Sequence, residues 1–331
     1  MYDSRIIRIP TDAASHLVCI TVAIIMIAVA ALLIFPVSLP VNGIIDIPLQ
    51  PGWFSSVPAV IINAAATIAL VLLISTITNR FGLTNSYSVL PTLFFLLMQC
   101  SNPMTGRILQ TGTIAAIAVM MCTNILFSNY QKPHVEGAVF RMTLTMAIIS
   151  LFWYDFALYI PIMWIGMGHM HLLRLKSLLA SLVAVAAVAW IYIFAAYSGL
   201  LPAPVNLLSD IKNSVTIPDY THLPASTIFT FISTIPAVIL FFAARLSSLY
   251  RETQDKISVR NYNMYINTLA FFSFVFMVIN PSQIFNYLPI FNCAVAIEAA
   301  RYFNVIKTKS KLRFLYLIVL TYFALYIIWI L

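Results

Sequence analysis

The chain of 331 residues consists of apolar runs that follow one another from end to end. A bilayer core about 30 Å thick needs about 20 apolar residues for each helical crossing. Lipid offers the backbone no hydrogen-bond partner, so each crossing segment must be a helix. Charged residues make up 8% of the sequence, which leaves too little polar surface to face water. The sequence therefore predicts an all-α polytopic transmembrane helical bundle, with residues 1–331 as a single transmembrane domain.

The apolar runs predict eleven spans, two of them short. The spans cover residues 17–39, 57–78, 88–101, 108–128, 142–154, 156–173, 178–198, 226–244, 262–280, 284–300 and 313–331. The first is predicted as a retained helix, because it is long enough to cross and ends without a small-residue cleavage site. Segments 88–101 and 142–154 either cross or return with the following segment as re-entrant hairpins. The second alternative leaves counts of seven or nine spans open.

The basic residues set the expected orientation. If the N-terminus is cytoplasmic and every span crosses, only Arg107 and Lys212 of the 18 Lys and Arg residues face outward. Cytoplasmic loops carry such an excess of basic residues, so the C-terminus is predicted to be periplasmic. If segment 88–101 alone failed to cross, most of this bias would reverse. The expected loops are outer ones near 40–56 and 199–225 and basic inner ones near 245–261 and 301–313.

The net charge of +8 is explained by these inner loops, and no RNA- or DNA-binding motif accompanies it. The expected partners are membrane lipids and other inner-membrane or envelope proteins, and no nucleic acid. The four cysteines form no Cys-x-x-Cys pair, and His169 and His171 are two residues apart, which points them to different helix faces. We therefore expect no metal site and no cofactor in a bacterial inner-membrane protein.

Three charged residues on the predicted outer side are candidate site residues. Asp46 and Asp155 could act as catalytic acids or bases, and Arg107 could bind a lipid phosphate through two hydrogen bonds. Asp155 follows Tyr154 at a turn between two apolar segments, where an ionised carboxylate is costly unless it has a partner. The alternative is that these residues are solvated loop acids and a helix cap. Trp53, Trp153 and Tyr154 lie near predicted outer boundaries, as expected of interfacial anchors.

Polar residues inside the later spans have a structural interpretation. Asn280, Asn286 and Asn292 are predicted to hydrogen-bond to neighbouring helices. Glu298 and Arg301 share one helical face near an inner end, which is typical of a structural pair. A proton-coupling role for Glu298 would need a deeper position in the membrane.

Three segments carry a resemblance to a family. VLPTLFFLLMQ, LFWYDFALYIPIMWIGM followed by LLRLKSLLASLVAV, and LPIFNCAVAIEAARYF resemble an uncharacterised family of integral inner-membrane proteins of Bacteroidota. The resemblance covers roughly residues 60–320, rests on layout and apolar patterning, and implies a bacterial inner membrane without naming catalytic residues. In layout the chain is also similar to multi-spanning glycosyltransferases that use polyprenyl-phosphate sugars, with Asp46 in the loop that carries their catalytic acid. Unlike them, it has one acid in that loop and ends in a helix.

These observations leave three functions open. The first is a non-catalytic membrane subunit or scaffold of a larger envelope complex, for which the lack of a catalytic motif is expected. The second is a glycosyltransferase-like enzyme or lipid-carrier-handling protein that acts at the periplasmic face through Asp46, Asp155 and Arg107. The third is a transporter, which the near absence of ionisable residues within the spans disfavours.

Overall fold

A computed structural model describes residues 18–26, 57–84, 88–102, 105, 111–199, 224–251, 255–304 and 309–330. These residues are 88% helical and contain no strand, which confirms the all-α prediction. Residues 18–26, within the first predicted span, are helical. The other helices are α3 (Val57–Arg80), α4 (Leu90–Cys100), α6 (Thr111–Ser128), α7 (Glu136–Phe152), α8 (Tyr159–His169), α9 (Leu175–Tyr197), α11 (Ala225–Arg251), α12 (Ile257–Ile279), α13 (Ile284–Phe303) and α14 (Lys309–Ile330), with 3-10 turns η1 (Tyr154–Leu158) and η3 (Pro281–Gln283).

Six of the described helices are long and apolar enough to cross a bilayer. They are Ile61–Arg80, Thr111–Ser128, Leu175–Tyr197, Ala225–Ser248, Ile257–Ile279 and Ser310–Trp329. This supports a membrane protein, while the count of eleven spans and the orientation stay predictions. The two short segments differ from each other. α4 has 11 residues, as short as expected, whereas α7 begins at Glu136 and reaches 17 residues.

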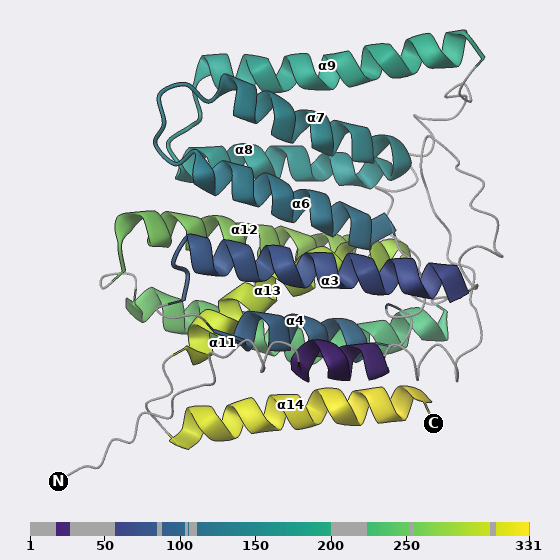
Figure 1. The fold of residues 1–331 in the computed structure, drawn as a ribbon, viewed down its shortest axis with the longest axis vertical. Helices are drawn as coiled ribbons and strands as arrows, with labels where there is room; N and C mark the ends of the chain where they lie inside the picture. Colours follow the sequence, from purple (N-terminus) through teal and green to yellow (C-terminus); the bar gives the residue numbers. More distant parts are fainter. Residues whose placement is uncertain are drawn as a thin grey trace.

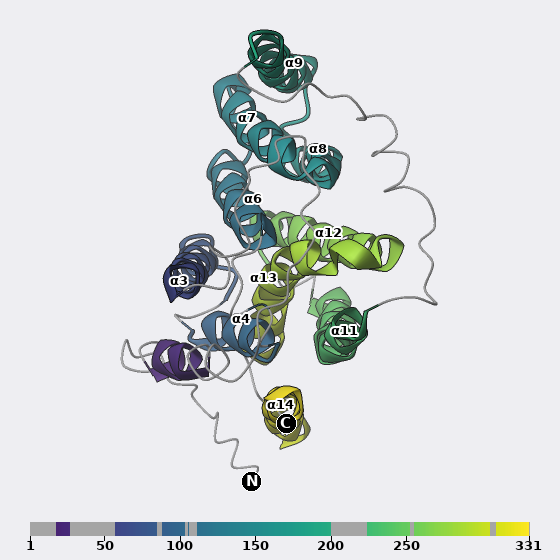
Figure 2. The same ribbon diagram turned by 90° about the vertical axis from the view of Figure 1, so that its right-hand side faces the viewer.

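The helices lie side by side with their axes nearly parallel, in a stack that begins at α9 and ends at α14 (Figure 1). Turned by 90°, the same stack shows α13 among α12, α4 and α11 near its middle (Figure 2). α13 contacts α12, α4, α11, α6 and α3, and nearly all of its residues are buried. Apolar side chains on every face, with four alanines between Ala294 and Ala300, suit this helix to the interior of the bundle.

α6 approaches α13 very closely at Gly112. A Cβ atom built on this glycine would lie 2.3 Å from the backbone oxygen of Asn286. Any larger residue would therefore push the two helices apart. Small residues at such crossings are what allows membrane helices to pack backbone against backbone.

Hydrogen bonds between distant segments define one end of the bundle, called here the Asp155 end. They join the N-terminal parts of α3, α6, α11 and α13 to the C-terminal ends of α4, α7 and α12. The bonds are Asn63 Nδ2 to Thr105 O (2.8 Å), Asn102 Nδ2 to Thr230 Oγ1 (3.0 Å), Thr111 Oγ1 to Asn286 Oδ1 (3.2 Å) and Asn280 Nδ2 to Asp155 Oδ2 (3.1 Å). α4 therefore runs back toward the end at which α3 begins, while the crossing of segment 88–101 stays a prediction.

The opposite end, called here the Arg301 end, is equally well defined. Asn261 Nδ2 donates to the Tyr130 hydroxyl (3.2 Å), and Arg174 donates to the backbone oxygen of Pro133 (2.9 Å). Arg301 forms an ion pair with Asp255 there.

Charge is distributed unequally between the two ends. Every Lys and Arg that the structure describes lies in the half of the bundle at the Arg301 end. These residues belong to the last turns of helices that end there, to the first turns of helices that begin there, or to the loops that join them. At the Asp155 end, Asp155 is the charged residue among those described. In the orientation predicted from the sequence, this basic end is the cytoplasmic one.

Candidate functional site

Asp155 lies where two helical turns meet. Its carboxylate accepts a hydrogen bond from Asn280 Nδ2 at 3.1 Å, and its side chain is buried. Asp155 belongs to η1, between α7 and α8, and Asn280 lies between α12 and η3. Ser282 Oγ donates in turn to Asn280 Oδ1 at 2.7 Å. The bond thus ties the α7–α8 turn to the α12–α13 turn.

Aromatic rings enclose this carboxylate. The Tyr287 hydroxyl interacts with Asp155, and the ring of Trp153 packs edge-on against that of Tyr287 with centroids 4.9 Å apart. Trp153 is completely buried, so the prediction that it is an interfacial anchor is wrong. The side chain turns into the bundle because Phe156 and Tyr287 offer it aromatic contacts there.

The structure places one of the three predicted site residues. Asp46 and Arg107 lie outside the described residues, so their proximity to Asp155 stays a prediction. The polar groups that the structure does place beside Asp155 come instead from the α12–α13 turn. On the same turn Gln283 Oε1 accepts from Asn286 Nδ2 at 2.6 Å, while Gln283 Nε2 is buried without a hydrogen-bond partner.

The predicted interhelical role of the three asparagines is confirmed. Asn280 donates to Asp155, and Asn286 Oδ1 accepts from the backbone nitrogen of Gly112 at 3.3 Å. Asn292 Nδ2 donates to Gln99 Oε1 on α4 at 3.2 Å. Each asparagine of this region therefore joins α12 or α13 to a different neighbour.

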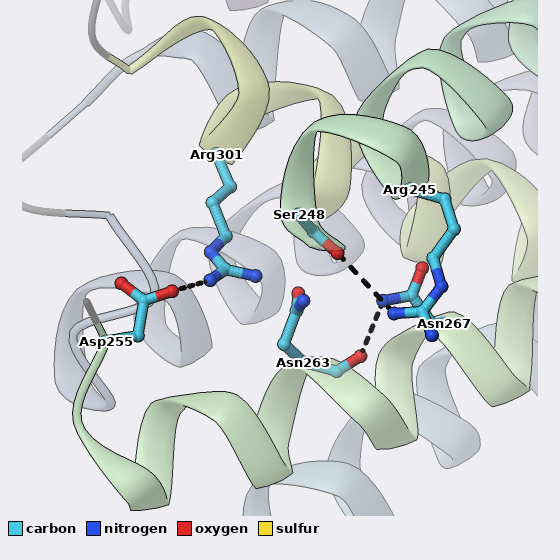
Figure 3. A network of polar contacts seen from close by, with 6 residues as sticks. All are labelled: Arg245, Ser248, Asp255, Asn263, Asn267 and Arg301. Atoms are coloured by element: carbon cyan, nitrogen blue, oxygen red, sulfur yellow. Dashed lines mark hydrogen bonds and ion pairs between the residues drawn. The ribbon is translucent and has the colours of Figure 1, made fainter. Parts of the chain in front are cut away.

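A second polar cluster lies at the Arg301 end, between α11, α12 and α13 (Figure 3). Arg301 on α13 pairs with Asp255 in the α11–α12 connection. Arg245 on α11 donates to Ser248 Oγ at 3.5 Å, and Asn267 Nδ2 donates to the backbone oxygen of Asn263 at 3.0 Å. In Figure 3 the Asn263 amide is drawn between the two guanidinium groups.

Glu298 is the buried acid of this cluster. It is 1% exposed, and its Oε1 atom has no hydrogen-bond partner. Both Arg301 and Arg245 act on it electrostatically. The sequence predicts a structural pair of Glu298 with Arg301, but the ion pair in the structure joins Arg301 to Asp255.

Metal-ligating residues do not gather in the part of the chain that the structure describes. No three His, Cys, Asp or Glu side chains come close enough there to hold a metal ion. The four cysteines are free thiols, three of them buried.

Comparison of the chain with family models, with curated proteins and with solved structures finds no match.

Sequence reasoning did not connect Asp155 with the α12–α13 turn or Arg301 with Asp255. The first pair is separated by 125 residues and the second by 46. An asparagine at the end of one apolar run and an aspartate between two others were the available signals. Both pairs follow once the helices are known to alternate in direction, because the partners then lie at the same end.

Proposed function

We propose that this protein is a non-catalytic integral subunit of an envelope complex in a bacterial inner membrane, with its N-terminus cytoplasmic and its C-terminus periplasmic. The observation that carries the proposal is the burial of Asp155 and its hydrogen bond with Asn280. A catalytic carboxylate must reach its substrate, whereas Asp155 is 5% exposed and is held by Asn280. This geometry suits a structural hydrogen bond that holds two helical turns together.

Other buried polar groups support the same interpretation. Gln99 with Asn292, and Asn102 with Thr230, join α4 to two further helices by side-chain hydrogen bonds. The hydroxyl oxygens of Tyr159 on α8 and Ser273 on α12 lie 3.0 Å apart and form another interhelical hydrogen bond. Interhelical bonds of this kind hold membrane helices in one arrangement. A rigid frame is what a scaffold needs.

The two edge helices are the proposed contact surfaces for partners. Among the described helices long enough to span, α9 and α14 are the least buried, with 22% and 17% of their most apolar 18 residues buried. α9 presents Trp190, Phe194 and Tyr197, which are 72%, 66% and 94% exposed. Aromatic residues are enriched at interfaces between proteins, although lipid alone can also cover such a face.

Site-specific photo-crosslinking in living cells distinguishes a protein partner from lipid. A photoreactive amino acid in place of Trp190 should give one discrete protein adduct. The matched control is Ala184 on the same helix, which is 0% exposed and should give adducts only within the chain. Lipid adducts alone at Trp190 and at Leu320 on α14 would contradict the proposal.

A further inference from the structure

Glu298 is an acid with incomplete solvation inside a bundle of apolar helices. It is 1% exposed, and Oε1 has no hydrogen-bond partner. An ionised carboxylate in such surroundings is costly unless donors satisfy both oxygens. Ionisable residues within membrane helices are often sites of proton or ion binding. Glu298 lies near a helix end, where water is close by, but the helices packed around it exclude that water.

Several elements carry charged residues near Glu298, and α14 places Lys311 over the ring of Tyr302 on α13. α4 and α6 pack against α13 and contain no charged residue. α3 carries Arg80 in its last turn, α12 carries Arg260 in its first, and α11 carries Arg245 and Arg251. The groups that act on the Glu298 carboxylate are Arg301 and Arg245. α12 faces the cluster with the neutral amides of Asn263 and Asn267.

Two of the described acids lie near Arg301. It pairs with Asp255 in the structure, and Glu298 precedes it by three residues on the same helix, where side chains are neighbours. The Asp255 side chain is 26% exposed, so water solvates it more easily than it solvates Glu298. The observed pairing satisfies the more exposed acid and leaves Oε1 of the buried one without a donor. That arrangement suits a neutral, protonated Glu298.

We infer that Glu298 is a binding site for an exchangeable proton, and that the proton decides which acid pairs with Arg301. With the proton bound, Glu298 is neutral and Arg301 pairs with Asp255. When the O–H bond breaks, the proton leaves to water at the Arg301 end, and the resulting carboxylate draws Arg301 away from Asp255. The O–H bond is the one covalent bond that changes.

The exchange has a structural consequence. Asp255 immediately precedes Lys256 and the start of α12, so its pairing with Arg301 ties the α11–α12 connection to α13. Loss of the proton releases this tie. The position of Asp255, just before the start of α12, is thereby made sensitive to proton binding.

Infrared spectroscopy tests the proton site directly. Wild-type protein in nanodiscs should show a protonated-carboxyl band that disappears as the pH rises and that shifts when glutamate is labelled with ¹³C. Glu298→Gln should lack the band, and Glu136→Gln, at the half-buried start of α7, should keep it. A wild-type spectrum without such a band at any pH at which the protein stays folded overturns the proposal, whether or not the variants fold.

A spin label tests the link to Asp255. The label is placed at the exposed position of Lys256, by Lys256→Cys in a chain whose native cysteines are replaced by alanine. Its mobility should rise with pH in otherwise wild-type protein, stay low at every pH with Glu298→Gln and stay high at every pH with Asp255→Asn. The same rise in the Glu298→Gln protein would contradict the link.

Discussion

Asn292 on α13 donates a hydrogen bond from Nδ2 to Oε1 of Gln99 on α4, across 3.2 Å and between residues 193 positions apart. Both side chains are 1% exposed. Gln99 Nε2 has no partner, so the pair is only partly satisfied. The bond fixes the short helix α4 against the central helix α13, and it does so where neither side chain can bond to water.

Replacing Asn292 by leucine should destabilise the protein, because Gln99 then keeps its desolvated oxygen without a donor. Interhelical hydrogen bonds in membrane proteins contribute about 0.6 kcal/mol on average and up to about 1.7 kcal/mol. Unfolding in mixed micelles should show a loss in this range. The double variant Gln99→Leu/Asn292→Leu should recover part of it, because two apolar side chains leave no unpaired group. A double variant less stable than either single variant would contradict the account.

Gly112→Ala should destabilise more than its size suggests. The added Cβ would lie 2.3 Å from the Asn286 backbone oxygen, and backbone on both helices must shift to admit it. Overpacking of this kind costs about 1–3 kcal/mol. Gly137→Ala on α7 is the matched control, because nothing lies within 4 Å of its Cβ position. It should leave stability unchanged or raise it by up to about 1 kcal/mol. Equal thermal shifts for both variants would show that the close approach is absent.

Ser181 should prove to be the attachment point of α9. Its Oγ accepts from Trp164 Nε1 at 2.9 Å and from Thr143 Oγ1 at 3.1 Å, which joins α9 to α8 and α7. Ser181→Ala should cost about 1 kcal/mol, since one buried and one partly buried donor lose their acceptor. Ser177→Ala is the control on the same helix, because Ser177 is equally buried but its Oγ has no partner. The account fails here if Ser177→Ala is the more destabilising change.

Cysteine accessibility should distinguish the two ends of the bundle. Ser198, just after α9, and Lys256, just before α12, are both exposed and lie at opposite ends. In the proposed orientation, an impermeant thiol reagent added to the periplasmic side should label Ser198→Cys in intact cells. Lys256→Cys should react only after the membrane is opened. Labelling in the reverse order would invert the topology.

Each described helix overlaps a predicted span, because apolar runs in lipid can only be helical, but helix ends differ from the predicted bounds by up to seven residues. The start of α12 lies at Ile257 rather than 262, and α11 ends at Arg251 rather than 244. The predicted boundaries stop at the first charges, whereas a helix continues past the apolar region while its backbone can still bond to itself. Helix periodicity gives no warning that α7 begins at Glu136, since its apolar residues are not gathered on one face.

The site is less predictable than the helices. The sequence identifies Asp155 as a candidate, because a carboxylate between apolar segments is costly. Its partner Asn280 cannot be chosen among the asparagines until the packing of the helices is known. The burial of Glu298 was missed for the same reason. Glu298 lies near the end of α13, where contact with water is expected, and only the packing of the surrounding helices excludes water from it.

The most direct test of the proposed function is native mass spectrometry of the full-length protein, extracted with a mild detergent from the membranes of its own cells. The account predicts a complex in which this chain is held in fixed stoichiometry with another membrane or envelope protein. It also predicts that the complex stays intact with Asp155→Asn, provided that this variant is folded. A chain that emerges without a protein partner and with a polyprenyl-phosphate lipid bound would contradict the subunit proposal and favour a lipid-carrier-handling protein.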